Sequence, residues 1–314
     1  YPTFDPNQFE SVKDYRLFGN AAVSSLFEPG SGFKVIAMAA GLNTGAVKPD
    51  TTYDDTGAVQ VSGHTIKNSA NHKYGVQTMV DVIQKSLNTG VIYVLGALGG
   101  NPSKISLRGK EVFYDYIQKF GFGKITGVEQ SGEAAGVVNP PISNDVNYAN
   151  MTFGQGISTT VLQMTMSVAA IANGGTLYKP YIVAEVSDAS GAVKQTEPTV
   201  IRKGLIKKKT AKELTHMMEQ VVLHGSGWMT KIPGYRVVGK TGTAQIPKPN
   251  GRGYEENKNI GTFVGFAPAD DPRFVMMVRI DEPKVSGFAE STTVPVFADI
   301  AKWLLRYWAV PPGA

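Results

Sequence analysis

The sequence predicts an α/β fold, and within that class an α+β chain in which a helical first half precedes strands and a closing helix. Residues 31–175 carry apolar residues mainly at helical spacing, interrupted by a loop-rich region at 47–74. Three runs of strand character lie within 235–281, and apolar residues recur at helical spacing from Val294 to Trp308. The chain of 314 residues is long enough for one large domain or two smaller ones.

Polar and turn-forming residues separate the expected elements from one another. Residues 1–30 form a polar lead-in, and the first helix is expected over the apolar run Phe33–Leu42, which residues 43–45 close. Further on we expect two extended runs within Tyr178–Ile201 around a turn at 188–191, a helix at Thr210–Val222, strands at Tyr235–Ile246, Asn259–Phe266 and Arg273–Asp281, and a helix at Val294–Trp308.

The closing helix carries an apolar stripe that we expect to pack on the sheet. Helical spacing relates the large side chains of this stripe to one another. They are Val296, Phe297, Ile300, Trp303, Leu304 and Tyr307. For Trp303 we expect core packing rather than a role in binding.

Composition excludes several kinds of site. The chain has no cysteine, which excludes disulfides and thiolate zinc sites, and its four histidines lack the spacing of metal ligands. We therefore expect neither a metal nor a cofactor. The net charge of +5 suits anionic partners such as cell-wall polymer or a membrane surface, although charge alone does not exclude nucleic acid. No stretch reads as a transmembrane or signal segment.

The first candidate site is an S-x-x-K motif, which occurs once and has Ser31 and Lys34 at its ends. Because Ser31 lies at the start of the apolar helical run, Lys34 is expected on the same face one turn later. An amine at that position can take the serine proton if desolvation or another cation keeps it unprotonated. Free N–H groups at the helix start can stabilise the oxygen of an attacked carbonyl. The alternative is a structural serine beside a solvated lysine.

The second motif, S-x-N, occurs twice, and its surroundings favour the copy at residues 86–88. This copy lies between two apolar-periodic segments, Val76–Ile83 and Val91–Leu98, at a joint between helices that can face a cleft. There Ser86 could relay a proton, and the amide of Asn88 could hold a substrate backbone group. The alternative is an ordinary helix break.

The other copy of S-x-N has the character of a surface loop. Ser69 lies in a polar stretch with Asn68, Asn71, His72 and Lys73. Hydroxyls and amides in such stretches commonly serve turns.

The third motif is the only K-T-G in the chain and continues to a second threonine, giving Lys240, Thr241, Gly242 and Thr243. Its β-branched neighbours predict a strand, which would point Lys240 and Gly242 one way and the two threonines the other. Glycine permits close backbone approach, and a strand edge with a lysine and two hydroxyls suits a peptide carboxylate. The alternative is a charged edge strand, where lysine discourages aggregation.

Motifs of these three kinds in this order occur in penicillin-binding proteins and class A β-lactamases. The chain closely resembles the transpeptidase domain of class B penicillin-binding proteins, of the cell-division and elongation type, over nearly its whole length. The matching stretches are Tyr1–Asn7, Glu28–Lys34, Gly121–Gly123, Gly132–Gly136, Gly154–Ser158, Asn173–Gly175, Gly239–Gln245 and Val264–Pro268. Two residues depart from the family pattern: Gly32, where threonine or valine is usual, and Leu87, where a small or polar residue is commoner.

The resemblance implies the fold of the penicillin-binding transpeptidases and β-lactamases. This fold has an antiparallel sheet with helices on both faces, a mostly helical subdomain, and the site between them. The resemblance also implies roles for individual residues. They are Ser31 as nucleophile, Lys34 as base, Ser86 as proton relay, Asn88 as the group that holds the substrate amide, Lys240, Thr241, Gly242 and Thr243 as the carboxylate-binding strand, and the backbone N–H groups of Ser31 and Thr243 as the oxyanion hole.

The implied reaction is peptidoglycan D,D-transpeptidation through a Ser31 acyl-enzyme, which β-lactams block because they mimic the donor. The implied partners are peptidoglycan stem peptides, β-lactams, a membrane anchor and a glycosyltransferase, with no nucleic acid and no cofactor. The implied place is the cell envelope, at the outer face of the cytoplasmic membrane, in cell-wall synthesis for division or shape.

Two other functions remain open at this point. A serine β-lactamase would share the motifs but needs another base that positions water, and no E-x-x-L-N element lies between the second and third motifs. The nearest carboxylate candidate, Glu133, belongs to a stretch that matches the transpeptidases. A β-lactam sensor domain, which is acylated once and signals, is the other alternative.

We expect residues 1–314 to be one transpeptidase domain that lacks its first strands, its N-terminal anchor and its pedestal domain. Family members usually place paired strands just before the stretch that matches Tyr1–Asn7, beside the last strand, here Arg273–Asp281. This strongly apolar strand is therefore expected to present an open sheet edge, or to be covered by a separate piece of polypeptide.

Overall fold

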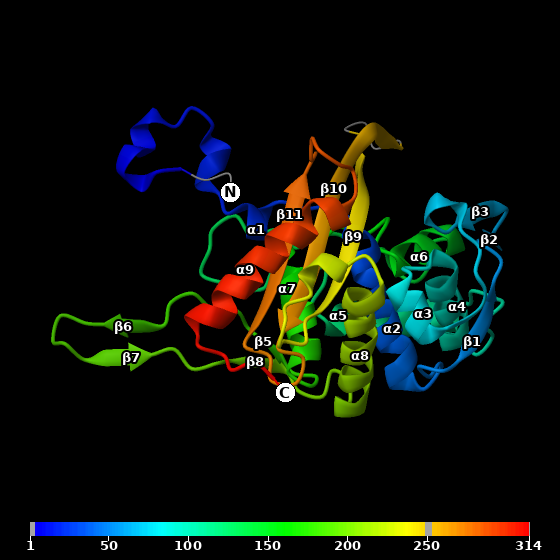
Figure 1. Ribbon diagram of the computed structural model, residues 1–314. Coiled ribbons are helices and arrows are strands. Elements are labelled where there is room, and N and C mark those ends of the chain that lie inside the picture. Colours follow the sequence, from blue (N-terminus) through cyan, green and yellow to red (C-terminus); the bar gives the residue numbers. More distant parts are fainter. Residues whose placement is uncertain (1–3, 249–252, 314) are drawn as a thin grey trace.

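Three long strands form the central sheet, in the order β11–β10–β9 and antiparallel throughout (Figure 1). They are β9 (Val238–Pro247), β10 (Tyr254–Ala267) and β11 (Phe274–Asp281). All three lie where the sequence predicts strands, although β10 begins earlier than expected. The computed structural model describes residues 4–248 and 253–313.

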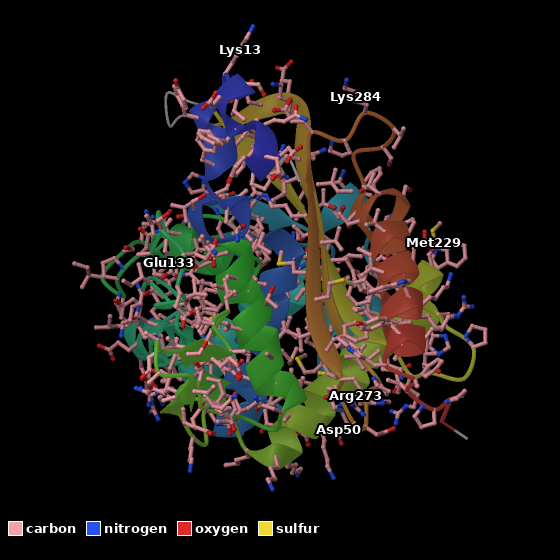
Figure 2. All side chains as sticks on the ribbon, turned by 90° about the vertical axis from the view of Figure 1, so that its left-hand side faces the viewer. Lys13, Asp50, Glu133, Met229, Arg273 and Lys284 are labelled. Atoms are coloured by element: carbon pink, nitrogen blue, oxygen red, sulfur yellow. The ribbon has the colours of Figure 1, made fainter. Side chains whose placement is uncertain are left out.

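Helices cover both faces of this sheet, as predicted. On one face Phe263 of β10 packs against Phe297 of α9 (Thr293–Tyr307), with ring centroids 4.7 Å apart. The next residue, Val264, points to the opposite face because side chains alternate along a strand. There it joins the larger core, to which α7 (Val161–Ala172) and α8 (Lys208–His224) contribute. Figure 2 shows the sheet edge-on, with α7 and α9 on opposite sides.

The prediction for the apolar stripe of α9 holds for Phe297 but was wrong for most of the stripe. Four of its large side chains are exposed instead of packed on the sheet: Val296, Ile300, Trp303 and Tyr307. Trp303 is 59% exposed and Tyr307 69%, and their rings stack on each other. The buried face consists of Thr293, Val294, Phe297, Ala298, Ala301 and Leu305. Its alanines allow close approach to the sheet, whereas the larger side chains dominate the apolar pattern in the sequence.

The helical subdomain lies beside β9 and consists of short helices with two small sheets (Figure 1). Its helices are α2 (Lys34–Thr44), α3 (Met79–Gln84), α4 (Asn88–Leu98), α5 (Leu107–Lys119) and α6 (Asp145–Thr152). The region predicted to be loop-rich contains three short strands, β1 (Thr52–Asp55), β2 (Ala58–Val61) and β3 (His64–Lys67), and a fourth, β4 (Gly75–Thr78), follows it directly. They pair as β1–β4 and β2–β3. Each strand has only four residues with a mixed polar pattern. A strand of this length is too short to show clear alternation of polar and apolar residues.

A hairpin projects from the body where two extended runs were predicted (Figure 1). Strands β6 (Glu185–Ser187) and β7 (Val193–Gln195) flank the predicted turn at 188–191. At its base β5 (Leu177–Tyr178) pairs with β8 (Val200–Arg202). The remaining short elements are α1 (Ala21–Ser24) and the 3₁₀ turns η1 (Pro6–Ser11), η2 (Tyr15–Phe18), η3 (Gly30–Phe33), η4 (Ser69–Asn71), η5 (Trp228–Thr230) and η6 (Ala289–Ser291).

Within residues 4–248 and 253–313 the outer edge of β11 is open, as predicted. Among the described residues β11 pairs only with β10. In the same part of the chain, no helix combines the length and the apolar character needed to cross a membrane.

Candidate active site

The predicted nucleophile lies at the turn that leads into α2. Ser31 belongs to η3, one residue after Gly30, whose φ of +55° favours glycine. A Cβ on Gly30 would lie 2.8 Å from the carbonyl oxygen of Thr243, so glycine allows the turn to approach β9 closely. Ser31 is partly exposed and opens onto a cleft of 550 Å³ between β9 and the helical subdomain.

Ser86 brings the two motif lysines together. Its hydroxyl lies 3.1 Å from Nζ of Lys34 and 3.0 Å from Nζ of Lys240. Lys34 also donates to the backbone carbonyl of Ser86. Ser86 has φ of +60°, a left-handed conformation that is uncommon for residues other than glycine. The turn between α3 and α4 thereby directs both the hydroxyl and the carbonyl of Ser86 toward Lys34.

Both lysines are fully buried, and among the described residues neither forms an ion pair with a carboxylate. Burial holds the pKa of Lys34 well below its usual value, and the nearby charge of Lys240 lowers that pKa further. Burial also lowers the pKa of Lys240, to about 7. Since two ammonium groups around one hydroxyl repel each other, one lysine is favoured in the neutral form. A neutral Lys34 can accept a proton.

Asn88 is the first residue of α4 and lines the cleft. Its Nδ2 donates to the backbone carbonyl of Lys67 over 2.8 Å. This bond turns Nδ2 toward Lys67, so that Oδ1 of Asn88 can accept a hydrogen bond from a substrate N–H.

Strand β9 forms the opposite wall of the cleft. Lys240 and Gly242 are buried, while Thr243 is exposed. A Cβ on Gly242 would lie 2.8 Å from the carbonyl oxygen of Pro29 and 2.4 Å from Oγ1 of Thr262, so only glycine fits against the nucleophile turn. The Oγ1 of Thr241 lies 2.6 Å from Oγ of Ser226. Hydroxyls thus border this end of the cleft, with the buried Lys240 behind them.

The structure therefore places all eight predicted site residues together. Five of them line the cleft, namely Ser31, Ser86, Asn88, Thr241 and Thr243. Lys34 and Lys240 reach it through Ser86, and Gly242 packs against the turn that carries Ser31. Their catalytic and binding roles are still predictions.

Sequence reasoning missed several residues of this site. Ser226 carries no motif and reaches Thr241 only because α8 packs beside β9. Glu28 accepts from the N–H of Gly156 at 2.8 Å and from the hydroxyl of Tyr254 at 3.1 Å, which ties two distant segments to the nucleophile turn. Burial raises the pKa of Glu28. No local sequence pattern predicts these contacts, because the partners lie far apart in the chain.

Asn68 requires a correction. Its polar neighbours in the sequence predict a surface loop, but Asn68 is 5% exposed and hydrogen-bonded to the start of α4. Its polar neighbours in sequence, Ser69, Asn71, His72 and Lys73, are exposed as predicted.

The chain is similar over nearly its whole length to known proteins. The family model described as "Penicillin binding protein transpeptidase domain" matches residues 1–302. The chain belongs to this family. This transpeptidase domain is 38% identical to Stage V sporulation protein D of Bacillus subtilis, over 99% of the chain and 47% of that protein. It is 31% identical to peptidoglycan D,D-transpeptidase FtsI of Escherichia coli, over 100% of the chain and 49% of that protein.

A solved structure shares the fold of this transpeptidase domain. Penicillin-binding protein 3 of Mycobacterium tuberculosis superposes with a TM-score of 0.88 and 35% identity, over 100% of this chain and 70% of that one. The same protein has been solved in complex with aztreonam and with ampicillin. The transpeptidase domain described here spans about half the length of the curated relatives it matches.

Proposed function

We propose that this transpeptidase domain cross-links peptidoglycan as a D,D-transpeptidase that works through an acyl-enzyme on Ser31. The observation that carries the proposal is the Ser86 hydroxyl between two buried lysines, beside a partly exposed serine and a strand edge of hydroxyls. The family and the printed names of the relatives support the same reaction.

Acylation begins when the Ser31 oxygen attacks the carbonyl between the two terminal D-alanines of a stem peptide. Neutral Lys34 takes the hydroxyl proton, and the N–H groups of Ser31 and Thr243 stabilise the oxyanion. The C–N bond then breaks, and the proton passes through Ser86 to the leaving amine. Protonated Lys240 binds the terminal carboxylate, and the acyl group remains as an ester on Ser31.

Deacylation transfers the acyl group to the amine of a neighbouring stem peptide. That amine attacks the ester carbonyl, the C–O bond to Ser31 breaks as the new amide bond forms, and the proton that the amine loses passes to the Ser31 oxygen. Asn88 holds the donor backbone through its Oδ1 in both steps. A β-lactam acylates Ser31 in the same way as the stem peptide. Its ring opens, but no leaving group departs from the cleft, and the ester therefore persists.

Rapid hydrolysis, as in a β-lactamase, has less support. None of the described residues that line the cleft is Asp or Glu, so no carboxylate is placed to activate water. Glu133, the nearest candidate from the sequence, accepts backbone N–H groups from Thr126 and Gly127 instead. In this proposal the whole protein works in the cell envelope, on the outer face of the cytoplasmic membrane, with a membrane anchor and a glycosyltransferase partner.

The deciding experiment combines adduct lifetime with product release. A fluorescent penicillin should label the protein once, at Ser31. The adduct should persist much longer than one turnover with a stem peptide takes. With a stem pentapeptide and an acceptor amine, D-alanine should be released and a cross-linked product should appear. Ser31→Ala should abolish both, while Ser190→Ala, in the projecting hairpin, should change neither.

Each alternative function has its own outcome in the same experiment. Rapid loss of the adduct with repeated β-lactam hydrolysis would identify a β-lactamase. A stable adduct without D-alanine release from any stem peptide would identify a sensor. A tryptic map that places the adduct on Ser86 would overturn the assignment of the nucleophile.

A further inference from the structure

Helix α4 begins at the second motif without a cap of its own. The residue at the N-cap position is Leu87, which is 1% exposed and has no side-chain oxygen to accept the first N–H groups. Helices usually begin with Ser, Thr, Asp or Asn at this position because the first N–H groups lack partners within the helix. In this chain the start of α4 also carries Asn88, so an uncapped start would leave a site residue poorly fixed.

Asn68 supplies the missing cap from elsewhere in the chain. Its Oδ1 accepts from the backbone N–H of Asn88 at 2.8 Å and of Thr89 at 3.2 Å. The Oγ1 of Thr89 lies 3.3 Å from the same oxygen. One buried side chain thus satisfies the first two N–H groups of α4, and Leu87 is free to pack in the core.

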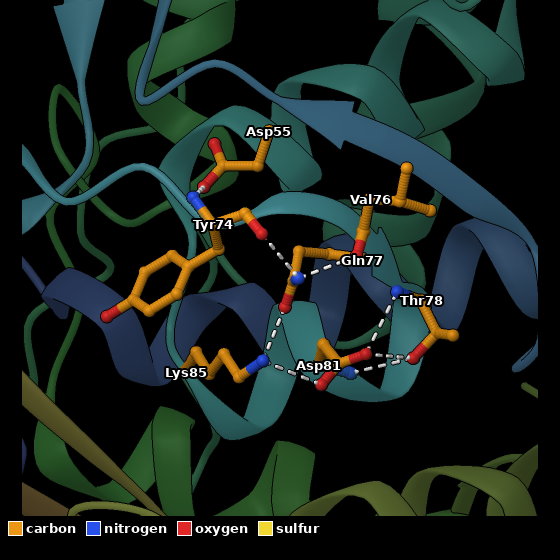
Figure 3. Close-up of polar contacts among 7 residues, drawn as sticks. All are labelled: Asp55, Tyr74, Val76, Gln77, Thr78, Asp81 and Lys85. Atoms are coloured by element: carbon orange, nitrogen blue, oxygen red, sulfur yellow. Dashed lines mark hydrogen bonds and ion pairs between the residues drawn. The ribbon is translucent and has the colours of Figure 1, made fainter.

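The carboxylate of Asp55 determines which way the Asn68 amide faces. Asp55 is fully buried, and its Oδ1 accepts from Nδ2 of Asn68 at 2.8 Å and from Oγ1 of Thr89 at 2.7 Å. The backbone N–H of Gly57 also donates to Oδ1, and that of Tyr74 donates to Oδ2, as Figure 3 shows for Tyr74. The oxygens of Asp55 are the acceptors in these four hydrogen bonds, so Nδ2 of Asn68, which is a donor, faces Asp55. Its Oδ1 is therefore left to face the helix.

The side chain of Asn88 depends on the same segment. Its Nδ2 donates to the carbonyl of Lys67, the residue immediately before Asn68. The backbone and the side chain of Asn88 are therefore both held by residues 67–68. A shift of this segment would move the cleft-facing amide in position and in orientation together.

A second polar cluster holds the other side of the motif. Lys85, which precedes Ser86, pairs with Asp81 at 3.0 Å and donates to Oε1 of Gln77 (Figure 3). This cluster is partly exposed, with 30% of the Lys85 side chain accessible, so its ion pair is expected to contribute less than the buried contacts of Asn68.

We infer that Asn68 is a positioning residue for the acylation reaction, which holds Asn88 in place by capping α4 from outside the helix. Asp55 orients Asn68, and Leu87 makes the external cap necessary. The inference rests on the proposed function of Asn88. It gives a structural reason for the departure at Leu87 from the residue types that are usual in the family.

The test is a double-mutant cycle in the full chain, read as the second-order rate of acylation by a fluorescent penicillin. Asn68→Ala should lower that rate on the order of tenfold, because it removes the cap and loosens a site residue. Asn88→Ala should lower it at least as much. If Asn68 acts through Asn88, adding Asn68→Ala to Asn88→Ala should lower the rate by less than about twofold more.

Asn173→Ala is the matched control. The Oδ1 of Asn173 also accepts two backbone N–H groups, from Gly175 and Thr176, and its Nδ2 donates to a carbonyl, but it lies at the far end of α7. This variant should lose a turn-stabilising asparagine without any change in acylation. Thermal unfolding of every variant shows whether the protein is folded at the assay temperature.

The outcomes separate the inference from the proposed function. Independent, multiplicative losses in the double variant would overturn the positioning role of Asn68, as would an Asn68→Ala protein that is folded and fully active. If Asn88→Ala itself has no effect, the proposed role of Asn88 fails, and the inference fails with it. If Asn68→Ala does not fold, Asn68→Ser, which keeps a shorter acceptor, should fold and show an intermediate rate, and a fully active Asn68→Ser would contradict the inference.

Discussion

The two walls of the cleft place their functional groups by different means. On the helical wall, Ser31, Ser86 and Asn88 come from turns and helix starts that are held by contacts between distant segments. On the sheet wall, Lys240, Thr241 and Thr243 follow one another along β9, whose register against β10 is continuous through this stretch. Reacting atoms must converge from several directions, whereas a carboxylate can be bound by neighbours on one strand.

The walls meet at the Ser86 hydroxyl, which lies within hydrogen-bonding distance of a lysine from each. If the division between them holds, changes on the helical wall should slow the chemical step, and changes on the sheet wall should weaken binding.

The largest difference is expected between the two lysines. Lys34→Met removes the base and should lower the acylation rate at saturating β-lactam on the order of a thousandfold. Lys240→Met keeps the base and should mainly raise the apparent dissociation constant, with a loss of roughly tenfold in the saturated rate. Progress curves over a range of β-lactam concentrations separate the two parameters. Equal losses in the saturated rate would contradict separate roles.

The contact between the walls should be sensitive to a single methyl group. Gly242→Ala would bring a Cβ to 2.8 Å from the Pro29 carbonyl oxygen and 3.2 Å from the Gly32 nitrogen, which forces β9 away from the nucleophile turn. Acylation should fall on the order of a hundredfold because Ser31 and the carboxylate-binding strand separate. Gly19→Ala, where an added Cβ meets only ordinary contacts, is the control. Unchanged acylation in Gly242→Ala would show that the walls need not touch.

Binding at the sheet wall should also depend more strongly on pH near neutrality than the chemical step at the helical wall does. Because burial lowers the pKa of Lys240 to about 7, the free site loses this positive charge as the pH rises through that value. The affinity for a β-lactam carboxylate should then fall about tenfold between about pH 6 and about pH 8. The saturated rate should not fall over this range, since a higher pH favours neutral Lys34.

Protein stability should change in the opposite direction, which distinguishes this effect from unfolding. Between the folded pKa of about 7 and the usual value of 10.5, the unfolded chain binds more protons at Lys240 than the folded chain does. The contribution of Lys240 to the free energy of unfolding therefore rises with pH across this window. A loss of affinity that tracks a falling melting temperature would contradict the assignment to Lys240.

The closing helix shows where prediction from sequence reached its limit. The position of α9 was predicted within one residue at each end, because apolar residues at helical spacing are a local property of the chain. Its buried face was not, because two stripes satisfy the same period. Only the packing against Phe263 and its neighbours selects the stripe with small residues and leaves Trp303 and Tyr307 exposed.

The sequence by itself determined the three motifs, the strands β9 to β11 and the family resemblance, since each depends on residues that are close together in the chain. Tertiary structure alone decided how these pieces act on one another. It placed Ser86 between Lys34 and Lys240, and it brought Asn68 to the start of a helix that lacks its own cap. The physical reason is the same in each case. A hydrogen bond between residues 20 or 154 positions apart leaves no periodic trace in either segment, so only the fold that joins them shows it.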